Sequence, residues 1–435
     1  MARTLTFGRR AWLATVLSSG TALALGRTPY GGVVRMKVPW PTATLDPHAI
    51  DDASAAIFGA AAFDPLFALD PNGRPYPALA AGLPERVASG LRVTLRPNLM
   101  TARGRALDAR DVLFALNRSR ARAGVGVLEA LGAPSGDHED PLAVIVRGND
   151  PTRLAVTLAS PVTAIVPRGF NAAAPDGTGA FIAETGPRRM LLRRNLHAAR
   201  GAAFLDRIEV SLASDLSDAL RAFEASETDA SWIGEFLHRP RPGAVRFAAG
   251  SFGWAVLFTG ADAGAWGAPG VAQKLLDSVP SSQLAHLGLE SLGRSSGAAS
   301  GWGGEPAEIL CPDDSPHLVA IAKQLSAVLA RPGHELRAAP RPRAELDYRK
   351  RARRFSLMLG FARRVAPGPS GALLSLLTAA DPALAKHPPQ SSPSDARRIG
   401  ATLSLGVVGE LAIRGAHTPG VRGLDSWDLG AVWRG

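Results

Sequence analysis

Residues 91–118 read LRVTLRPNLMTARGRALDARDVLFALNR, and the two halves of this stretch have different periods. Leu91–Leu95 alternates apolar and polar residues, which is the pattern of a half-buried strand. Asp108 then precedes a segment that places Val112 and Ala115 on one helical face, and an aspartate at that position caps a helix. The stretch predicts a strand, a loop and a capped helix.

The same two patterns recur along the chain. Apolar–polar alternation or short apolar runs predict further strands, and the 3.6-residue period predicts further helices. The predicted strands are Leu154–Leu158, Ile208–Leu212 and the buried, central Phe355–Leu359; the predicted helices follow Asp215 and cover His317–Ala330. Strands that alternate with helices indicate an α/β or mixed α+β protein.

Composition excludes several protein classes. The chain has 435 residues, of which 46% are hydrophobic, so a disordered protein is excluded and two or three domain-sized units are expected. The one cysteine, Cys311, excludes a disulfide within the chain and any multi-cysteine metal site. Its neighbours Ile309 and Leu310 are apolar, which predicts a buried, unreactive thiol.

The net charge of +11 comes mainly from arginine, because five of the 49 basic residues are lysines. The basic run Arg349–Arg354 is compatible with nucleic-acid binding or with a solvated helix end. The run stops where a buried strand is predicted to begin, which favours the helix end. No nucleic-acid partner is expected.

The first 24 residues resemble an export signal. They combine early arginines with a short apolar run, and Ala22–Ala24 has the small-residue pattern of a cleavage site. The pair Arg9–Arg10 resembles the twin-arginine signal, with an ordinary secretory signal as the alternative. No cysteine follows the apolar run, so a lipoprotein anchor is not expected. The sequence predicts a periplasmic protein that is cleaved near Ala24.

Motifs for catalysis are scarce in the sequence. The nine histidines include no pair at helical spacing, so no metal site is predicted. Gly293–Gly297 matches the Gly-x-Ser-x-Gly elbow of serine hydrolases, with Ser295 as the nucleophile. The flanking segments are rich in Gly and Ser and lack the strand and helix that the elbow needs. We therefore predict no enzyme and no cofactor, with an exported hydrolase as a lesser alternative.

The order of several short segments carries a resemblance to a known family. These segments are Gly32–Pro39, Leu45–His48, Phe63–Phe67, Leu91–Asn98, Leu107–Arg118, Gly177–Phe181, Leu192–Asn195, Leu205–Glu209 and Glu227–Ala230. Together, behind an export signal, they resemble the solute-binding proteins of ABC importers, in the peptide- and nickel-binding group known as family 5. The resemblance runs from about Gly32 to Trp232 and returns more faintly from Pro306 to Phe361 and at the C-terminus.

The resemblance implies a two-lobed periplasmic binding protein of type II (cluster C), with a discontinuous first lobe and a cleft between the lobes. It places the first lobe at 25–245 and 396–435 and the second lobe at 246–395. A small-molecule or peptide ligand would bind in the cleft, and the closed form would be recognised by the membrane permease. A monomer is expected. The alternative is a scaffold that has lost transport and acts as a sensor or interaction protein.

The same resemblance supplies candidate ligand-binding residues. In the family, the stretch that follows the first strand lines the cleft; here it contains Trp40, Thr42 and Thr44. An indole can stack on a ligand, and hydroxyls can donate hydrogen bonds to it. Trp254, beside the predicted crossing between lobes, and Phe361 complete the apolar candidates.

Arg363 and Arg364 mark a departure from the family. Peptide-binding members have an aspartate shortly after the corresponding strand, and it pairs with the α-ammonium of the ligand. An arginine pair at this place favours an acidic or neutral ligand. The competing interpretation is that both side chains point into solvent at the start of a loop.

Overall fold

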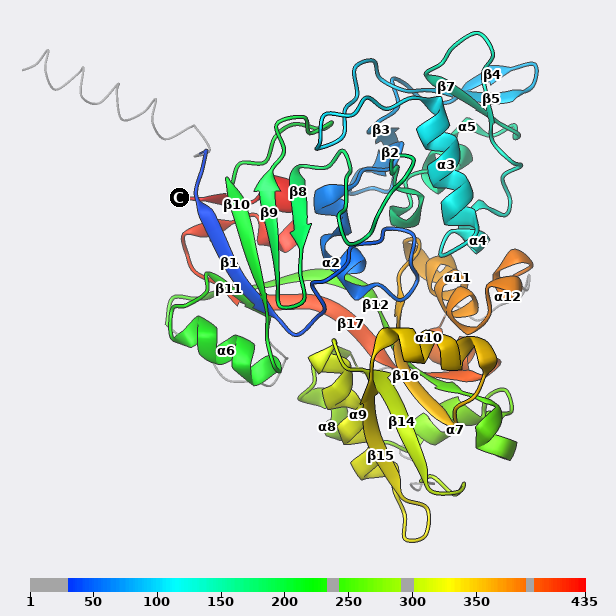
Figure 1. The fold of residues 1–435 in the computed structure, drawn as a ribbon, viewed down its shortest axis with the longest axis vertical. Coiled ribbons are helices and arrows are strands. Elements are labelled where there is room, and N and C mark those ends of the chain that lie inside the picture. Colours follow the sequence, from blue (N-terminus) through cyan, green and yellow to red (C-terminus); the bar gives the residue numbers. More distant parts are fainter. Residues whose placement is uncertain (1–29, 233–241, 291–300, 389–394) are drawn as a thin grey trace, which may run out of the picture.

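The computed structural model describes residues 30–232, 242–290, 301–388 and 395–435, built around one large sheet of eleven strands (Figure 1). The strands are β1 (Val33–Val38), β8 (Phe181–Thr185), β9 (Arg189–Arg194), β10 (Arg207–Leu212), β11 (Ala230–Trp232), β12 (Val245–Thr259), β13 (Leu289–Glu290), β14 (Ala307–Pro312), β15 (Leu336–Arg341), β16 (Leu357–Arg363) and β17 (Leu405–His417). Their order is β15-β14-β16-β12-β17-β11-β1-β10-β9-β8, with β13 beside β17.

Two long strands connect the halves of this sheet. β12 has 15 residues and β17 has 13, and they pair antiparallel with each other. β12 also pairs with β16, and β17 also pairs with β11. We call β11-β1-β10-β9-β8 the first half-sheet and β16-β14-β15 the second half-sheet. The register of the β12–β17 pair shifts on both sides of Ser251, and such irregularities bend strands.

The first half-sheet is built on β1, which runs parallel to β10 and β11. Val34, Met36 and Val38 alternate with more exposed residues and are buried. Helix α6 (Leu216–Glu224) packs on this half-sheet, and Asp215 caps it as predicted. Helix α2 (Ala53–Ala62) begins at the cap Asp52 and packs against β8, β12 and β16.

A small four-stranded sheet, in the order β4-β5-β7-β6, lies at the upper right of Figure 1, and its strand β5 covers the start of the segment 91–118. The strand and the capped helix predicted there are confirmed as β5 and α3, where Asp108 and Asp111 form a capping box. The elements of this region are β2 (Phe67–Leu69), β3 (Pro75–Pro77), β4 (Glu85–Val87), β5 (Gly90–Thr94), β6 (Ser135–Gly136), β7 (Ala143–Val146), α3 (Ala109–Arg120), α4 (Val125–Leu128), α5 (Pro151–Thr157) and a 3-10 turn at Pro161–Thr163.

The strand predicted at Leu154–Leu158 is wrong, because these residues lie in and at the end of helix α5. Asp150 caps the helix by accepting a hydrogen bond from the Arg153 N–H, and Pro151 occupies the first turn. Proline suits that position because the first-turn N–H groups have no partner within the helix. The cap at Asp150 and the proline in the first turn favour a helix more strongly than a five-residue apolar–polar alternation favours a strand.

The second half-sheet has β14 parallel to both β15 and β16, with β16 between β14 and β12. The buried central strand and the helix His317–Ala330 are confirmed as β16 and α9. Arg351, Arg353 and Arg354 are exposed at the end of α10, as predicted for the basic run. The helices here are α7 (Val271–Asp277), α8 (Ser282–Ala285), α9 (Pro316–Leu329), α10 (Arg343–Ala352), α11 (Gly368–Ala380), α12 (Pro382–Lys386) and α13 (Ala396–Gly400).

The C-terminal segment returns to the first half-sheet. The short hairpin of β18 (Val421–Arg422) and β19 (Trp433–Arg434) ends beside β1, where the Arg434 side chain donates to the Val33 carbonyl over 2.7 Å. Short 3-10 turns at Leu424–Ser426 and Leu429–Ala431 lie between these strands. Both ends of the described chain therefore stabilise the same half-sheet.

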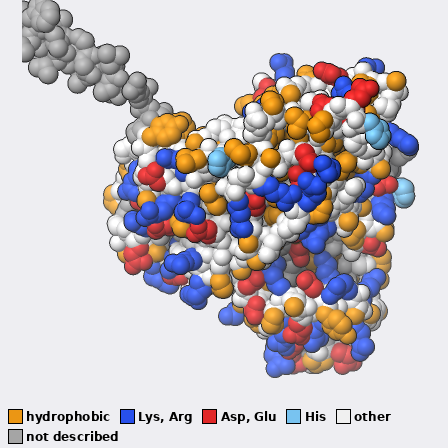
Figure 2. All heavy atoms as spheres, turned by 45° about the horizontal axis from the view of Figure 1, so that its top comes forward, with side chains coloured by type: hydrophobic (Ala, Val, Ile, Leu, Met, Phe, Trp, Pro, Cys, Tyr) orange, Lys and Arg blue, Asp and Glu red, His pale blue; other side chains and the backbone are white. Residues whose placement is uncertain are grey.

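The face drawn in Figure 2 carries basic, acidic and hydrophobic side chains. Figure 2 shows Lys and Arg side chains in several groups on one face, with acidic side chains among them. None of the helices in the described segments has the length and apolar character that crossing a bilayer requires. Cys311 is confirmed as buried, and burial raises the pKa of its thiol to about 11, so the thiol is inert at neutral pH.

Candidate binding site

The loop after β1 is held against the second half-sheet by backbone hydrogen bonds. The His317 N–H, in the first turn of α9, donates to the Pro39 carbonyl over 3.3 Å. The Arg363 N–H, at the end of β16, donates to the Ile50 carbonyl over 2.8 Å. We call this contact region, residues 39–52 against α9 and β16, the seam.

Aromatic rings fill the centre of the seam. The Trp40 ring lies 4.9 Å from the His317 ring and 5.3 Å from the Phe252 ring, centroid to centroid. Phe361 and Trp232 each pack against Phe252, at 5.4 Å and 5.7 Å. These separations are typical of favourable aromatic pairs. We call these five residues the aromatic cluster; its rings come from both half-sheets and from β12.

Several polar atoms in the seam are buried without a partner. Trp40 Nε1, Ser315 Oγ and His317 Nδ1 have no hydrogen-bond partner among the described residues. Such an atom costs about 1–3 kcal/mol, and in native proteins it often marks the place of a water or a ligand. Burial lowers the pKa of His317 to about 4, so the ring is neutral at pH 7. The seam therefore offers spare donors and acceptors.

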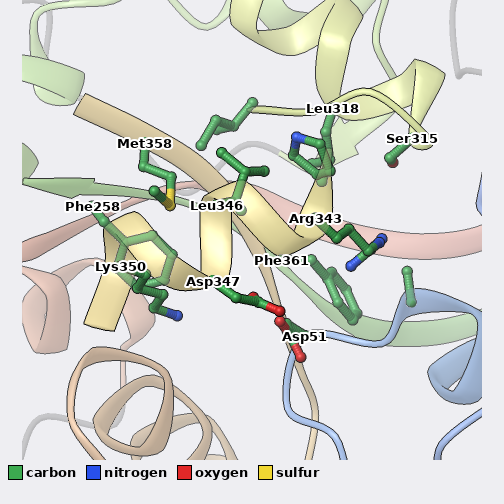
Figure 3. A pocket seen from close by; sticks show the side chains of 14 residues that line it. Asp51, Phe258, Ser315, Leu318, Arg343, Leu346, Asp347, Lys350, Met358 and Phe361 are labelled. Carbon is green, nitrogen blue, oxygen red and sulfur yellow. The ribbon is translucent and has the colours of Figure 1, made fainter. Parts of the chain in front are cut away.

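A small cavity at the seam has charged walls (Figure 3). We call it the ionic cavity; it encloses about 40 Å³, which is enough for a few waters. Its charged lining residues are Asp51 from the loop before α2 and Arg343, Asp347 and Lys350 from α10, and Ser315 also lines it. Figure 3 shows the Asp51 and Asp347 carboxylates pointing toward one another. Charged residues from both sides of the seam therefore line the cavity.

Burial perturbs the charges around the ionic cavity. Burial raises the pKa of Asp347, and the nearby Asp51 charge raises it further. Burial also lowers the pKa of Lys350, whose ammonium lies 4.2 Å from the centroid of the Phe258 ring. Arg343 forms an ion pair with Asp314. The lining therefore combines two facing carboxylates with two partly desolvated cations.

A larger pocket lies beside the seam, between α2, β12 and the loop after β16. It encloses about 440 Å³, within the range of sites for small organic ligands. Its walls are mostly apolar, and its charged lining residues are Arg200, Arg363 and Arg364. No acidic residue of the described chain lines it. We call it the arginine pocket.

Arg363 is buried in the wall of this pocket, with 2% of its surface exposed. Its Nη1 donates to the Pro47 carbonyl over 2.7 Å, and its Nη2 donates to the Ala55 carbonyl over 3.4 Å. Arg363 Nε has no hydrogen-bond partner, and the Arg363 side chain forms no ion pair, within the described part of the chain. Burial lowers the pKa of Arg363 to about 10, an effect that Asp52 and Asp46 oppose. The guanidinium remains charged at pH 7 without a directly paired carboxylate.

The other polar residues of the arginine pocket differ in their pairing. Arg364 forms an ion pair with Glu410, and Arg200 pairs with Asp64 over 3.4 Å. The Ser251 hydroxyl, on the bent part of β12, is buried and has no partner among the residues described. Arg363 Nε and Ser251 Oγ are therefore two buried, unpartnered donors on residues that line one pocket.

Comparison with known proteins finds relatives by structure alone. No protein-family model and no curated protein matches the sequence. The oligopeptide-binding protein AppA from Bacillus subtilis, in complex with a nonapeptide, superposes with a TM-score of 0.68 at 12% identity, covering 94% of this chain and 100% of AppA. NikA from Staphylococcus aureus with Ni(L-His)2 gives 0.65 at 13% identity, covering 93% and 100%. The chain has the fold of a family 5 solute-binding protein.

A third structure extends the range of ligands found with the family 5 fold. The binding protein AgaA from A. tumefaciens R10, in complex with agropinic acid, superposes with a TM-score of 0.63 at 16% identity, covering 93% of this chain and 99% of AgaA. The predicted fold class, a two-lobed type II binding protein, is confirmed by these similarities. Proteins with this fold therefore bind peptides, a nickel complex and an organic acid.

The family 5 fold brings the predicted site residues to different places. Trp40 and Phe361 meet in the aromatic cluster, with 6.1 Å between ring centroids. Thr42 is buried and donates its hydroxyl to the Gly186 carbonyl over 2.7 Å, whereas Thr44 is exposed. Trp254 is buried, and the Arg364 guanidinium lies 4.6 Å from its ring centroid.

The arginine pair lies in the wall of the arginine pocket. Arg363 and Arg364 both line it, as a ligand contact would require. The solvent-facing interpretation is wrong for Arg363, because β16 continues through this residue and pairs it with Gly253. Whether either arginine contacts a ligand stays a prediction.

The sequence did not predict the ionic cavity or the contact between His317 and Trp40 across the seam. One lining residue, Asp51, is far in the chain from the other three. Those three, Arg343, Asp347 and Lys350, lie in a charge-rich helix whose end was predicted to face solvent. His317 was predicted only as the first residue of its helix, and the sequence did not connect it to Trp40.

The remaining candidates for chemistry find no support in the described chain. Ser295 and its flanking residues lie outside the described residues, so the hydrolase alternative is not examined by the structure. No three His, Cys, Asp or Glu side chains in the described segments are grouped as a metal site would need. The export signal also lies outside the described residues.

Proposed function

We propose that this chain is an exported, periplasmic solute-binding protein that traps a small ligand between two lobes and presents it to the permease of an ABC importer. The family 5 fold supports this proposal, because the solved proteins that share it bind peptides or other small ligands. No catalytic role is proposed. We further propose that the protein is exported through its N-terminal 24 residues, without a lipid anchor, and acts as a monomer.

The observation that carries the proposal is the concentration of unsatisfied polar groups where the half-sheets meet. Trp40, Ser315 and His317 each have a buried atom without a partner in the described structure, and the ionic cavity and the arginine pocket lie beside them. A permanently closed interface would be expected to satisfy such groups. A site that closes on a polar guest would leave them available for that guest.

We propose lobes at 25–245 with 396–435 and at 246–395, joined within β12 and β17. Rotation about these two strands would open the seam and separate Trp40 from His317. Ligand binding would then shift the population toward the closed form, and no reaction is required.

A ligand screen tests the function. The purified protein is heated with peptides, amino acids, organic acids and metal complexes, and a ligand at 100 times its Kd should stabilise it by about 2.7 kcal/mol. Each hit is then added in small-angle X-ray scattering, where closure should lower the radius of gyration. The proposal fails if hits are converted to products, or if they bind without any change in shape.

The alternative scaffold function rests on the aromatic cluster, which already fills the centre of the seam with rings such as Trp40, which is fully buried. A scaffold predicts no thermal shift with any member of the panel and a radius of gyration that does not change. The same screen therefore separates the two functions.

A further inference from the structure

We infer that the arginine pocket binds the carboxylate of a small acid that has an apolar body. This inference rests on the proposed binding function and names the ligand class. It concerns the pocket lined by Ser251, Arg363 and Arg364 rather than the ionic cavity on the other part of the seam.

The first step is the charge of the pocket. Its three charged lining residues are all arginines, and Arg364 and Arg200 already have carboxylate partners in Glu410 and Asp64. Arg363 has none in the described chain, and its two terminal nitrogens donate to backbone carbonyls. Asp52 and Asp46 act on this charge without forming an ion pair with it, and a ligand carboxylate would supply the direct partner that a buried cation lacks here.

The second step is the number of free donors. Arg363 Nε–H and Ser251 Oγ–H are both buried without partners in the described structure, and both residues line the pocket. A carboxylate has two oxygens that each accept hydrogen bonds, and charge-assisted bonds are stronger than neutral ones. Two donors and one positive charge without a directly paired carboxylate match a single carboxylate better than a dianion.

The third step is the rest of the wall. Most of the other lining residues are apolar, including Ala56, Phe63, Phe252, Ile413 and Trp427. A ligand that fills about 440 Å³ against such walls gains mainly from apolar burial. The same pocket disfavours an ammonium group, because three arginines and no carboxylate of the described chain surround it.

A matched set of probes tests the inference by calorimetry on the purified protein. The probes are 3-phenylpropionate, 3-phenylpropionamide and 3-phenylpropylamine, which share a body and carry charges of −1, 0 and +1. We expect the acid to bind at least about tenfold more tightly than the amide, and the amine not to bind. Equal affinity for acid and amide, or preference for the amine, overturns the inference.

Variants place the binding in this pocket. Ser251→Ala removes an unpartnered hydroxyl, so folding should not suffer, and affinity for the acid should fall about tenfold. Ala60 lines the pocket and is exposed, so Ala60→Glu and Ala60→Gln should both fold. The Glu variant should bind the acid at least about tenfold more weakly than the Gln variant, because only it brings a competing carboxylate. Equal affinities for these two variants contradict the inference.

Arg363→Met tests the charged group itself. It removes a buried charge and keeps an unbranched apolar stem, so we expect unchanged or higher thermal stability and loss of acid binding. If this variant does not fold, the Ser251 and Ala60 variants carry the test. If a peptide or another non-acid closes the lobes while these acids do not bind, this inference is wrong and the proposed function stands; if nothing in the broad screen binds, the proposed function fails.

Discussion

The Trp40 indole packs against the His317 imidazole, with 4.9 Å between the ring centroids. Trp40 follows the first strand of the chain, whereas His317 begins a helix of the second half-sheet. This contact and the backbone bond from His317 to Pro39 join the two halves of the molecule at their centre. Substitutions of Trp40 or His317 should therefore change the free energy of unfolding through the contact between the two half-sheets.

Trp40→Ala should lower the free energy of unfolding by about 3–5 kcal/mol, because it empties a fully buried site in the aromatic cluster. Urea unfolding followed by circular dichroism measures the change. Leu196→Ala is the control, since Leu196 is 83% exposed and should change stability by less than about 0.5 kcal/mol. A loss below 1 kcal/mol for Trp40→Ala without ligand would show that the ligand-free protein populates the open form. A loss that small with a closing ligand bound would contradict the prediction.

His317 should make stability depend on pH. Burial lowers its pKa from 6.5 to about 4, so the unfolded chain takes up the proton first as the pH falls. The stabilisation is complete above pH 6.5 and is lost as the pH falls toward 4. From pH 7 to pH 5 this one group should cost about 2 kcal/mol.

The variant His317→Phe isolates that contribution from His48, whose pKa burial also lowers to about 4. Urea midpoints at pH 7, 6 and 5 should fall less steeply in the variant than in the parent. His387→Gln, at an exposed position, should leave the slope as it is. Identical slopes for all three proteins would show that His317 is accessible to protons.

Gly415→Ala should strain the pairing of the connecting strands. A Cβ at this residue of β17 would lie 2.1 Å from the Ser231 carbonyl oxygen and 2.6 Å from the Phe247 ring. Overpacking of this kind costs about 1–3 kcal/mol. Gly82→Ala is the matched control, because nothing lies within 4 Å of its Cβ. Thermal unfolding of both variants checks the prediction, and equal melting temperatures would refute it.

Asp111→Ala should destabilise the region around α3 by about 1–3 kcal/mol, since it removes the hydrogen bonds that two exposed arginines and the helix N-terminus make to a buried carboxylate. The Asp111 carboxylate accepts hydrogen bonds from Arg105 and Arg168 and completes the capping box with Asp108. Differential scanning calorimetry measures the loss. Asp425→Ala, at an exposed site, should have little effect; a similar loss for both would show that the ion pairs of Asp111 contribute nothing.

The local elements could be predicted from the sequence where the signals are local. Asp108 and Asp215 marked helix starts, and the β16 region was recognised as a buried central strand. At Leu154–Leu158 the apolar–polar alternation predicted a strand where the structure has a helix, because five residues are too few to separate a strand from a short capped helix. Two of the predicted contacts, Trp40 and Phe361, were found to share one cluster.

The sequence by itself determined the elements that have a clear cap or hydrophobic period, such as β5, α3 and α6, because hydrophobic periodicity and capping act over a few neighbouring residues. The tertiary structure alone decided which side chains meet at the seam. Asp51 faces Asp347, and Arg363 is buried beneath α2 instead of pointing into solvent, because β12 and β17 bring distant segments together. Burial and the lack of an ion pair in the described chain, which make Arg363 a candidate binding group, are properties of that packing.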